Sequence, residues 1–404
     1  MPFFLYLLGL AVFAQGTSEF MLSGLLPDIA ADLQISLSAA GSLTSAFAVG
    51  MIVGAPLMAI LSLRWSRRGA LLTFLVTFLL VHIVGAVTTD YEVLLATRVI
   101  AALANAGFLA VALATATAAV PPNAKGRATS VLLGGTTMAC IAGVPAGALL
   151  GELWGWRSAF WAVALVSVPA VVAIVWSVPA GGGRDSAGGE PSARGELRAL
   201  RSPRLVVTLL LGALVNGATF CTFTYLAPLV TDVAGIGTSW VPAVLALFGL
   251  GSFVGVGVGG RLADTRPVPL LVTGGVALLI GWAVLALTAG SPAAAVVLVF
   301  VQGTLSFAVG STLIAQALYA ATGAPTLAGG FATAALNVGA AIGPWWGGAA
   351  LGMGFGYRGP VWVSVLLVAL ALATGGVAGA VSRRKTAKNN DRQPVVTTRL
   401  PGSP

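Results

Sequence analysis

The chain has 404 residues, of which 57% are hydrophobic and only 8% are charged, whereas about a quarter of the residues in a soluble domain are charged. This composition excludes an ordinary soluble globular protein and a disordered one. The net charge of +9 comes from 21 Lys and Arg against 12 Asp and Glu. Because no basic stripe is interleaved with aromatic residues, nucleic acid is not an expected partner. The sequence therefore predicts a polytopic membrane protein.

Apolar runs of about 20 residues, the length that crosses a bilayer as a helix, follow one another along the chain. The first six cover residues 3 to 26, 38 to 61, 70 to 88, 93 to 118, 129 to 150 and 158 to 178. Six more cover residues 205 to 226, 240 to 259, 269 to 289, 293 to 320, 327 to 350 and 360 to 381. We therefore expect an all-α protein with twelve transmembrane helices. The first run is too long for a signal peptide and should remain as a span.

The distribution of basic residues predicts the orientation of these helices, because Lys and Arg are retained on the cytoplasmic side. With the N-terminus inside, 18 basic residues lie in cytoplasmic segments, two in external loops and one, Arg98, within a span. Both termini are therefore expected in the cytoplasm. We expect two six-helix bundles, residues 1–178 and 205–381, joined by a Gly- and Arg-rich cytoplasmic linker, 179–204, and followed by a basic cytoplasmic tail, 382–404.

The two halves align with each other at an offset of 201 positions. The aligned pairs include Gln15 with Asn216, Gly16 with Gly217, Ser18 with Thr219, Pro27 with Pro228, and Gly155-Trp156-Arg157 with Gly356-Tyr357-Arg358. Six helices repeated in the same orientation predict two bundles related by an axis along the membrane normal, with a binding site between them. This architecture favours transport by alternating access.

The segments Ala14 to Phe20 (AQGTSEF) and Leu26 to Ala30 (LPDIA) carry a family resemblance. With the twelve runs, they closely resemble bacterial chloramphenicol-resistance exporters, which are drug:proton antiporters of the major facilitator superfamily. The resemblance extends over about residues 3 to 381. It implies a multidrug or chloramphenicol exporter that takes up protons as drug leaves, works as a monomer in the bacterial cell membrane and needs no cofactor beyond the proton gradient.

The resemblance also implies residues that control the conformational change. The family's G-x-L-A-D-R loop signature follows the eighth run as Gly260 to Asp264, and its first copy, Ala59 to Arg68, has Leu63 where the family has an acid. The glycine-proline signature of antiporters lies in the fifth run, Gly143 to Gly147. The expected members of these motifs are Arg64, Arg67, Arg68, Gly143, Pro145, Gly147, Gly260 and Asp264.

Glu19 is the one acid that lies deep in a predicted span. A carboxyl group in hydrocarbon is costly and is a functional candidate by default, often as a proton carrier. Gln15, Glu19 and Ser23 are spaced at i, i+4 and i+8, so a continuous helix would place them on one inward face. The alternative is a structural carboxyl group that hydrogen-bonds across helices. The family resemblance favours a role for Glu19 in proton coupling and drug binding.

Arg98 is the second candidate for coupling, and Asn105 follows it seven residues later on the same helix face. Arginine stays protonated, so Arg98 would bias a nearby carboxyl group and would not carry the proton itself. Its long side chain could instead extend to the membrane surface. His82, the single histidine, is expected to make a polar contact between helices.

The predicted spans of the second half contain no charged residue, so its side of the binding site should offer apolar surface and neutral hydrogen-bonding groups. These suit a neutral, aromatic substrate with hydroxyl groups. The candidate substrate contacts in this half are Asn216, Phe220, Phe223, Gln302 and Ser306. For each of them, a hydrogen bond or contact between helices is an equally open alternative.

Other sites are not expected. Gly255, Gly257 and Gly260 match G-x-G-x-x-G formally, but no strand precedes them, and close helix packing through Gly251, Gly255 and Gly259 is better supported. No P-loop or zinc motif is present, and Cys140 and Cys221 lie far apart in apolar runs, so we expect no catalytic or metal site. Two other functions remain open: a proton-coupled importer of a small metabolite and, more remotely, an intramembrane enzyme that uses His82.

Overall fold

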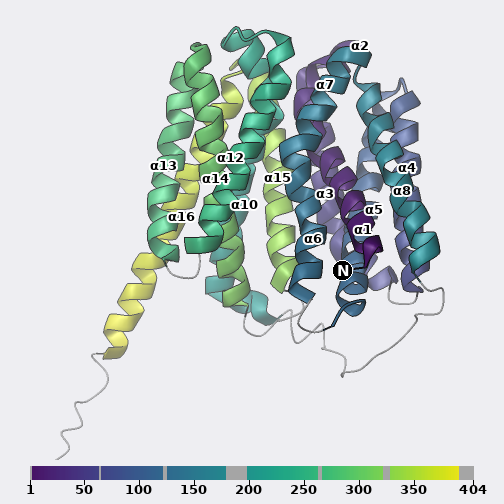
Figure 1. Cartoon of the computed structure of the whole chain (residues 1–404). Helices are drawn as coiled ribbons and strands as arrows, with labels where there is room; N and C mark the ends of the chain where they lie inside the picture. The colour runs from purple at the N-terminus through teal and green to yellow at the C-terminus, as the bar shows by residue number, and fades with distance from the viewer. Residues whose placement is uncertain are drawn as a thin grey trace, which may run out of the picture.

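The structure is a computed structural model that describes residues 2–62, 65–121, 125–178, 198–262, 266–321 and 328–390. All regular secondary structure in these residues is helical. The helices run roughly parallel in two groups that stand side by side, α1 to α8 and α10 to α16 (Figure 1).

The described residues of the first group form eight α-helices. They are α1 (Phe3–Phe20), α2 (Leu26–Asp32), α3 (Leu37–Ser62), α4 (Arg67–Val87), α5 (Tyr91–Ala118), α6 (Lys125–Met138), α7 (Val144–Trp154) and α8 (Arg157–Ser177). A 3₁₀ turn, Met21–Gly24, separates α1 from α2, and a π-helical turn, Ala139–Gly143, joins α6 to α7.

The described residues of the second group form seven α-helices. Its helices are α10 (Pro203–Thr224), α11 (Leu226–Pro228), α12 (Val241–Leu262), α13 (Pro267–Thr288), α14 (Pro292–Ala320), α15 (Ala328–Gly352) and α16 (Gly359–Asn390). Short elements are the 3₁₀ turns Arg198–Arg201 and Thr238–Trp240 and the π-helical turn Leu229–Val233.

Local sequence signals set the helix starts. Asp90 caps α5 by accepting a hydrogen bond from the backbone N–H of Val93 at 3.0 Å, and Ser66 caps α4 through Gly69 at 3.1 Å. Proline stands in the first turn of α10, α13 and α14, where its missing N–H is not needed.

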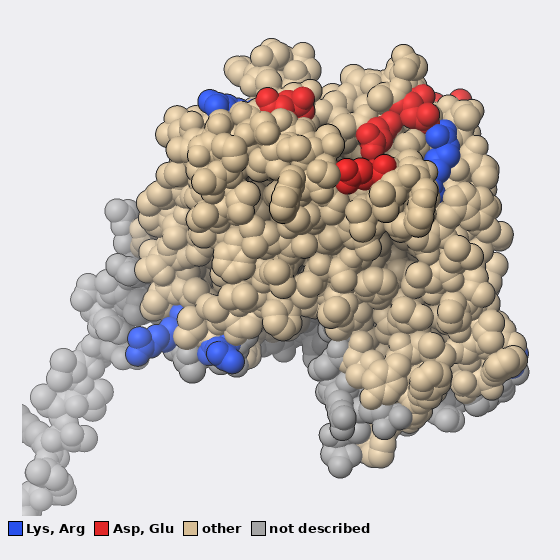
Figure 2. All heavy atoms as spheres, turned by 45° about the horizontal axis from the view of Figure 1, so that its top comes forward, with Lys and Arg blue, Asp and Glu red and all other residues tan. Residues whose placement is uncertain are grey.

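Eleven helical segments of the described chain are long and apolar enough to cross a bilayer. The predicted eleventh run corresponds to α15, which is long enough to span, but its many glycines, Asn337, Pro344 and two tryptophans lower its hydropathy. Large apolar side chains cover the periphery, as shown by Trp176, which is 83% exposed, and Leu165, which is 66% exposed. Acidic residues gather at one end of the molecule, and the wide band below them carries no charge on the visible face (Figure 2).

The predicted glycine stripe of α12 is confirmed as a packing surface. A Cβ atom on Gly251, Gly255 or Gly259 would collide with the backbone of α14. Between the two groups, α3 packs on α15, and α12 packs on α7 and on the π-helical turn that precedes it.

The internal repeat is visible in the backbone. Gly155 and Gly356, which lie 201 positions apart, both have positive φ, 80° and 65°. Each glycine makes the corner before the last long helix of its group, α8 or α16. The left-handed conformation favours glycine at both places.

Candidate functional site

Glu19 lies in the last turn of α1 and is partly exposed. The α-helix ends at Phe20, and the chain continues as the 3₁₀ turn Met21–Gly24. The spacing predicts that Ser23 shares one α-helical face with Gln15 and Glu19. This prediction is wrong for Ser23, because the α-helix ends before it. Its hydroxyl instead donates to the carbonyl of Phe20 at 3.0 Å and is buried.

Arg98 of α5 is 1% exposed, so its side chain does not extend to the membrane surface. Its Nη1 donates to Ser18 Oγ at 2.8 Å and its Nη2 donates to the Ser18 carbonyl at 2.7 Å. The guanidinium also lies over the ring of Phe47, 4.5 Å from the centroid, in a cation–π contact. Arg98 and Glu19 interact electrostatically, but no ion pair within 4.0 Å joins them.

Gln15 and Asn105 are both buried in the first helix group. The Asn105 amide donates to the sulfur of Met51 at 3.5 Å, which is a weak interaction between α5 and α3. Both polar side-chain atoms of Gln15 have no hydrogen-bond partner among the described residues. A buried amide without partners is costly, which marks Gln15 as a place for bound water or a polar ligand.

Aromatic rings connect the two groups of helices beside Glu19. Phe20 and Phe220 have ring centroids 5.5 Å apart across the junction. The series continues from Phe220 to Phe223 at 6.2 Å, from Phe223 to Phe248 at 4.6 Å and from Phe248 to Phe307 at 6.2 Å. These spacings are typical of favourable aromatic pairs. Phe20, Phe220 and Phe307 are only partly buried, so they offer ring surface to a ligand.

The predicted polar residues of the second half contact neighbouring helices. The Asn216 amide donates to the Leu336 carbonyl of α15 at 2.7 Å, and the Gln302 amide donates to the Leu278 carbonyl of α13 at 3.1 Å. Gln302 is fully buried and fits against Gly281 of α13, and its Oε1 has no partner among the described residues. Ser306 is buried, and its hydroxyl has no partner among the described residues.

The glycine-proline motif of the fifth run coincides with a change of helix type. Gly143 ends the π-helical turn, and Pro145 stands in the first turn of α7. A Cβ atom on Gly143 would collide with the side chain of Thr17, and one on Gly147 would lie 3.2 Å from the Cβ of Met21. The motif therefore lets this segment approach α1 and the turn after it.

The loop motifs are described only in part. Arg67 and Arg68 begin α4, and Gly260 lies in the last turns of α12. Arg64 and Asp264 lie outside the described residues.

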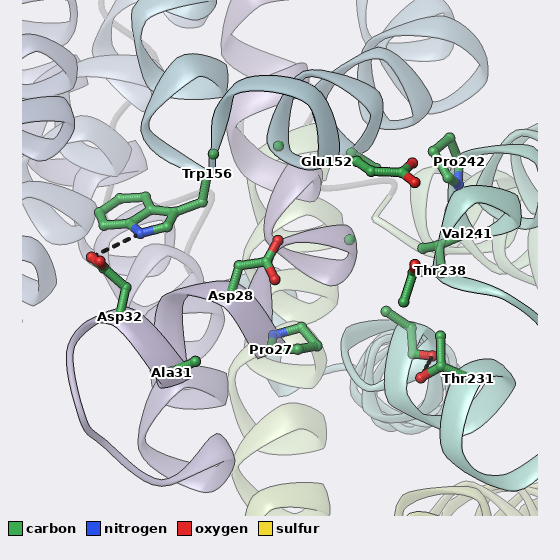
Figure 3. Close-up of a pocket in the computed structure, with 15 residues that line it drawn as sticks. Pro27, Asp28, Ala31, Asp32, Glu152, Trp156, Thr231, Thr238, Val241 and Pro242 are labelled. Atoms are coloured by element: carbon green, nitrogen blue, oxygen red, sulfur yellow. Dashed lines mark hydrogen bonds between the residues drawn. The ribbon is translucent and has the colours of Figure 1, made fainter.

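A pocket of about 680 Å³ opens between the two groups at the end where the acids gather. Figure 3 shows Asp28 and Asp32 on α2, Glu152 on α7, and Thr231, Thr238 and Val241 across from them. Asp32 accepts hydrogen bonds from Arg157 at 2.6 Å and from Trp156 at 3.2 Å. The hydrogen bond from Arg157 is the main reason why the pKa of Asp32 is lowered. Desolvation, and then the charge of Glu152, raise the pKa of Asp28.

The residues that sequence reasoning missed are Ser18, Phe47 and Phe20. Ser18 is the partner of Arg98 and is fully buried. It stands directly before Glu19 in the motif that carries the resemblance. In the alignment of the two halves, Ser18 pairs with Thr219, so a hydroxyl occurs at this position in both halves, and this was a signal that could have identified it. In the part of the chain that is described, no group of three or more His, Cys, Asp or Glu could hold a metal ion.

The sequence profile of the Major Facilitator Superfamily matches residues 8–333. A chloramphenicol resistance protein of Streptomyces lividans is 59% identical over 372 residues, which cover 92% of this chain and 95% of that protein. The inner membrane transport protein YdhP of Escherichia coli K12 is 34% identical over 365 residues, which cover 90% of this chain and 93% of that protein. These relatives confirm the resemblance and exclude the enzyme alternative.

Solved structures share the fold. A bacterial homologue of the human lysosomal transporter Spinster, in an inward-facing and unoccupied conformation, superposes with a TM-score of 0.75 at 16% identity, covering 92% of this chain and 94% of that chain. The same transporter in an inward-facing and occupied conformation superposes with a TM-score of 0.71 at 16% identity, covering 93% and 96% of the two chains.

Proposed function

Because this chain belongs to the Major Facilitator Superfamily, as a multi-pass transporter of the bacterial cell membrane, we propose that it exports chloramphenicol or a close phenicol in exchange for protons. The observation that carries the proposal is the position of Glu19. It is a partly exposed acid within a span, it lies near Arg98 without an ion pair, and it adjoins the Phe20 to Phe220 contact between the two halves.

The proposed cycle is alternating access between bundles of residues 1–178 and 205–381. We call the end of the molecule that carries Asp28, Asp32 and Glu152 the acidic end. Contacts there support a state that is closed to the outside. Gly24 fits against Ala148 and Leu245, and Gly41 fits against Tyr225. Release of drug to the outside would require these contacts to separate, and the small residues on one side of each contact make a close but reversible fit.

The proposed topology has twelve spans, with α15 as the eleventh of them. Both termini, the linker 179–204 and the tail 382–404 would then be cytoplasmic, which agrees with the positive-inside rule. The acidic end in Figure 2 would face the outside. We expect the transporter to work as a monomer.

A neutral aromatic drug suits this site. The rings of Phe20 and Phe220 offer surface for an aromatic ring, and the buried amide of Gln15 lacks a partner among the described residues. The candidate spans of the second half carry no charged residue away from their ends, so no group there demands an ionic ligand. In this proposal, Glu19 and Arg98 serve proton coupling, whereas Gln15, Asn105, Phe220 and Phe223 surround the drug.

Drug susceptibility in a host without its own efflux pumps tests the proposal. The wild-type chain should raise resistance to chloramphenicol, and a protonophore or the Glu19→Gln variant should remove the gain, because glutamine keeps the shape of the side chain but does not ionise. Equal resistance with wild type and Glu19→Gln, at matched membrane expression, would contradict it. Everted vesicles distinguish the exporter from the importer alternative. Under an inside-acid gradient, an exporter accumulates labelled substrate in the vesicles, whereas a proton-coupled importer removes it from them.

A further inference from the structure

His82 of α4 is connected to Arg98 through the hydroxyl of Ser18. Its Nε2 lies 2.6 Å from Ser18 Oγ, and Arg98 Nη1 donates to the same oxygen at 2.8 Å. The other ring nitrogen of His82, Nδ1, lies 2.7 Å from the carbonyl oxygen of Phe78. None of the three side chains is more than 1% exposed. The set is a buried polar chain across α5, α1 and α4.

For a neutral imidazole, the partners fix the direction of every hydrogen bond in this chain. The Phe78 carbonyl can only accept, so Nδ1 of His82 carries a proton and donates it. The guanidinium of Arg98 can only donate, so Ser18 Oγ accepts from it. The Ser18 hydroxyl proton is then free to point at Nε2 of His82, which is the acceptor in a neutral ring that carries its proton on Nδ1. If His82 were protonated on both nitrogens, Ser18 would accept twice and its own proton would lose this acceptor.

The environment of His82 leaves it few other roles. Its ring lies between Phe78, with centroids 4.1 Å apart, and Phe160, at 5.8 Å. Among the described residues, the ionisable groups that face Glu19 from other elements are Arg98 on α5 and Cys140 on the π-helical turn, whereas His82 faces Ser18. The Ser18 hydroxyl and carbonyl hold both Nη atoms of Arg98, while no ion pair joins the guanidinium to Glu19.

We infer that His82 is a positioning residue for proton coupling: as a neutral Nδ1–H tautomer it orients the Ser18 hydroxyl, which holds Arg98 near Glu19 but out of a direct ion pair. Without this acceptor, the Ser18 hydroxyl is no longer oriented toward Nη1, and only the Ser18 carbonyl and the Phe47 ring still hold the guanidinium, which then turns more readily toward the Glu19 carboxylate. A directly paired Glu19 stays ionised and has no proton to exchange for drug. The consequence for transport rests on the proposed function, whereas the arrangement of the three side chains does not.

The first test needs no substrate. His82 is the only histidine of the chain, so ¹⁵N-histidine labelling of the full-length protein in detergent gives one imidazole signal without assignment. Long-range ¹H–¹⁵N correlation should show the Nδ1–H tautomer at neutral pH. Ser18→Ala should shift the Nε2 resonance, because it removes the hydrogen-bond donor. An Nε2–H tautomer, an imidazolium or a spectrum unchanged by Ser18→Ala would overturn the inference.

The second test separates positioning from packing. His82→Leu should bind chloramphenicol with an affinity within about twofold of wild type, yet release about fivefold fewer protons on drug addition, because Glu19 is already ionised. His82→Gln should keep wild-type release, since its amide oxygen can accept from Ser18 at the place of Nε2. Equal loss of binding and release in both variants would indicate a packing role and overturn the inference. If wild type itself releases no proton, the proposed coupling fails, and the tautomer test still decides the role of His82.

Discussion

The hydroxyl of Tyr225 lies directly against Gly41 and donates a hydrogen bond to the Pro344 carbonyl of α15 at 3.0 Å. One side chain at the end of α10 therefore contacts a helix of the first group and a helix of the second. A Cβ atom at Gly348, on α15, would also lie 2.7 Å from the same hydroxyl and 2.8 Å from Ser38 Oγ. This end of the interface between α3 and α15 closes only because its contact positions are glycine.

Gly41→Ala should shift the protein toward the state that is open at the acidic end. The added methyl group overlaps Tyr225, and overpacking of this kind costs about 1–3 kcal/mol in the closed state alone. A cysteine at Ser38, in a chain without Cys140 and Cys221, should react at least about fivefold faster with a membrane-impermeant maleimide. Gly257→Ala is the matched control, since nothing lies within 4 Å of its Cβ. Identical labelling rates in the two variants would refute the prediction.

Asp28→Asn and Asp32→Asn should change thermal stability in opposite directions at neutral pH. The pKa of Asp28 is raised in the folded state, so its ionised form destabilises the fold, and this penalty disappears as the pH falls through the folded pKa. The pKa of Asp32 is lowered, so its ionised form stabilises the fold until the pH falls through the folded pKa.

At pH 7, Asp28→Asn should raise the melting temperature by about 1 °C and Asp32→Asn should lower it by a similar amount. The gain from Asp28→Asn should vanish near pH 4, where the carboxyl of an unfolded chain also takes up its proton. Melting curves of the purified variants from pH 4 to pH 8 measure both trends. A shift of the same sign for the two variants would contradict the assignment.

Phe220→Ala and Gln302→Met should separate drug contact from helix packing. Phe220 offers ring surface beside Phe20, so its loss should weaken chloramphenicol binding about tenfold. Gln302 is fully buried, and its amide donates to the Leu278 carbonyl and packs against Gly281, while its Oε1 has no partner among the described residues. If it is a packing residue, Gln302→Met should leave affinity within about twofold and lower the melting temperature, because the hydrogen bond to Leu278 and the fit against Gly281 are lost. Binding and melting measured on the same preparations check this, and the reverse pattern would place Gln302 in the drug site.

Membrane potential alone should drive export. Exchange of one neutral drug molecule for one proton moves positive charge inward, so an inside-negative potential favours it by about 2.3 kcal/mol per 100 mV, or a drug gradient of about fiftyfold. Proteoliposomes with a potassium diffusion potential and no pH difference provide the measurement. Glu19→Gln is the control, because it should show no response to the potential. Drug movement that ignores the potential would indicate an electroneutral exchange.

Sequence reasoning located the fold because its signals are local. Apolar runs set the helices, and positions repeated at one offset, such as Gly155 and Gly356, both have a positive φ. The stripe of Gly251, Gly255 and Gly259 packs on α14 as its spacing predicts. The end of α1 at Phe20 was missed, because no proline or glycine stands at that residue to mark the change to a 3₁₀ turn.

The details of the site depend on tertiary structure. Ser18 meets His82 from 64 residues away and Arg98 from 80 residues away, and a serine within an apolar helix gives no sign of either partner. Gln302 and Asn216 have spacings that suit a ligand face, yet each amide finds a carbonyl on a neighbouring helix. Periodicity predicts which side of a helix is buried but not which neighbour lies there.

The two corners at Gly155 and Gly356 differ in the side-chain interactions that stabilise them. At the first corner, Arg157 forms an ion pair with Asp32 at 2.6 Å and donates a hydrogen bond to the Thr88 carbonyl at 2.9 Å. The start of α8 is thereby linked to the end of α2 and to the loop between α4 and α5. The position offset from Asp32 is Val233, and Arg358 makes no ion pair with any described residue. An epitope tag or fluorescent reporter inserted beside Gly356 would therefore break no ion pair of the described residues. The same insertion beside Gly155 would disrupt the ion pair between Arg157 and Asp32.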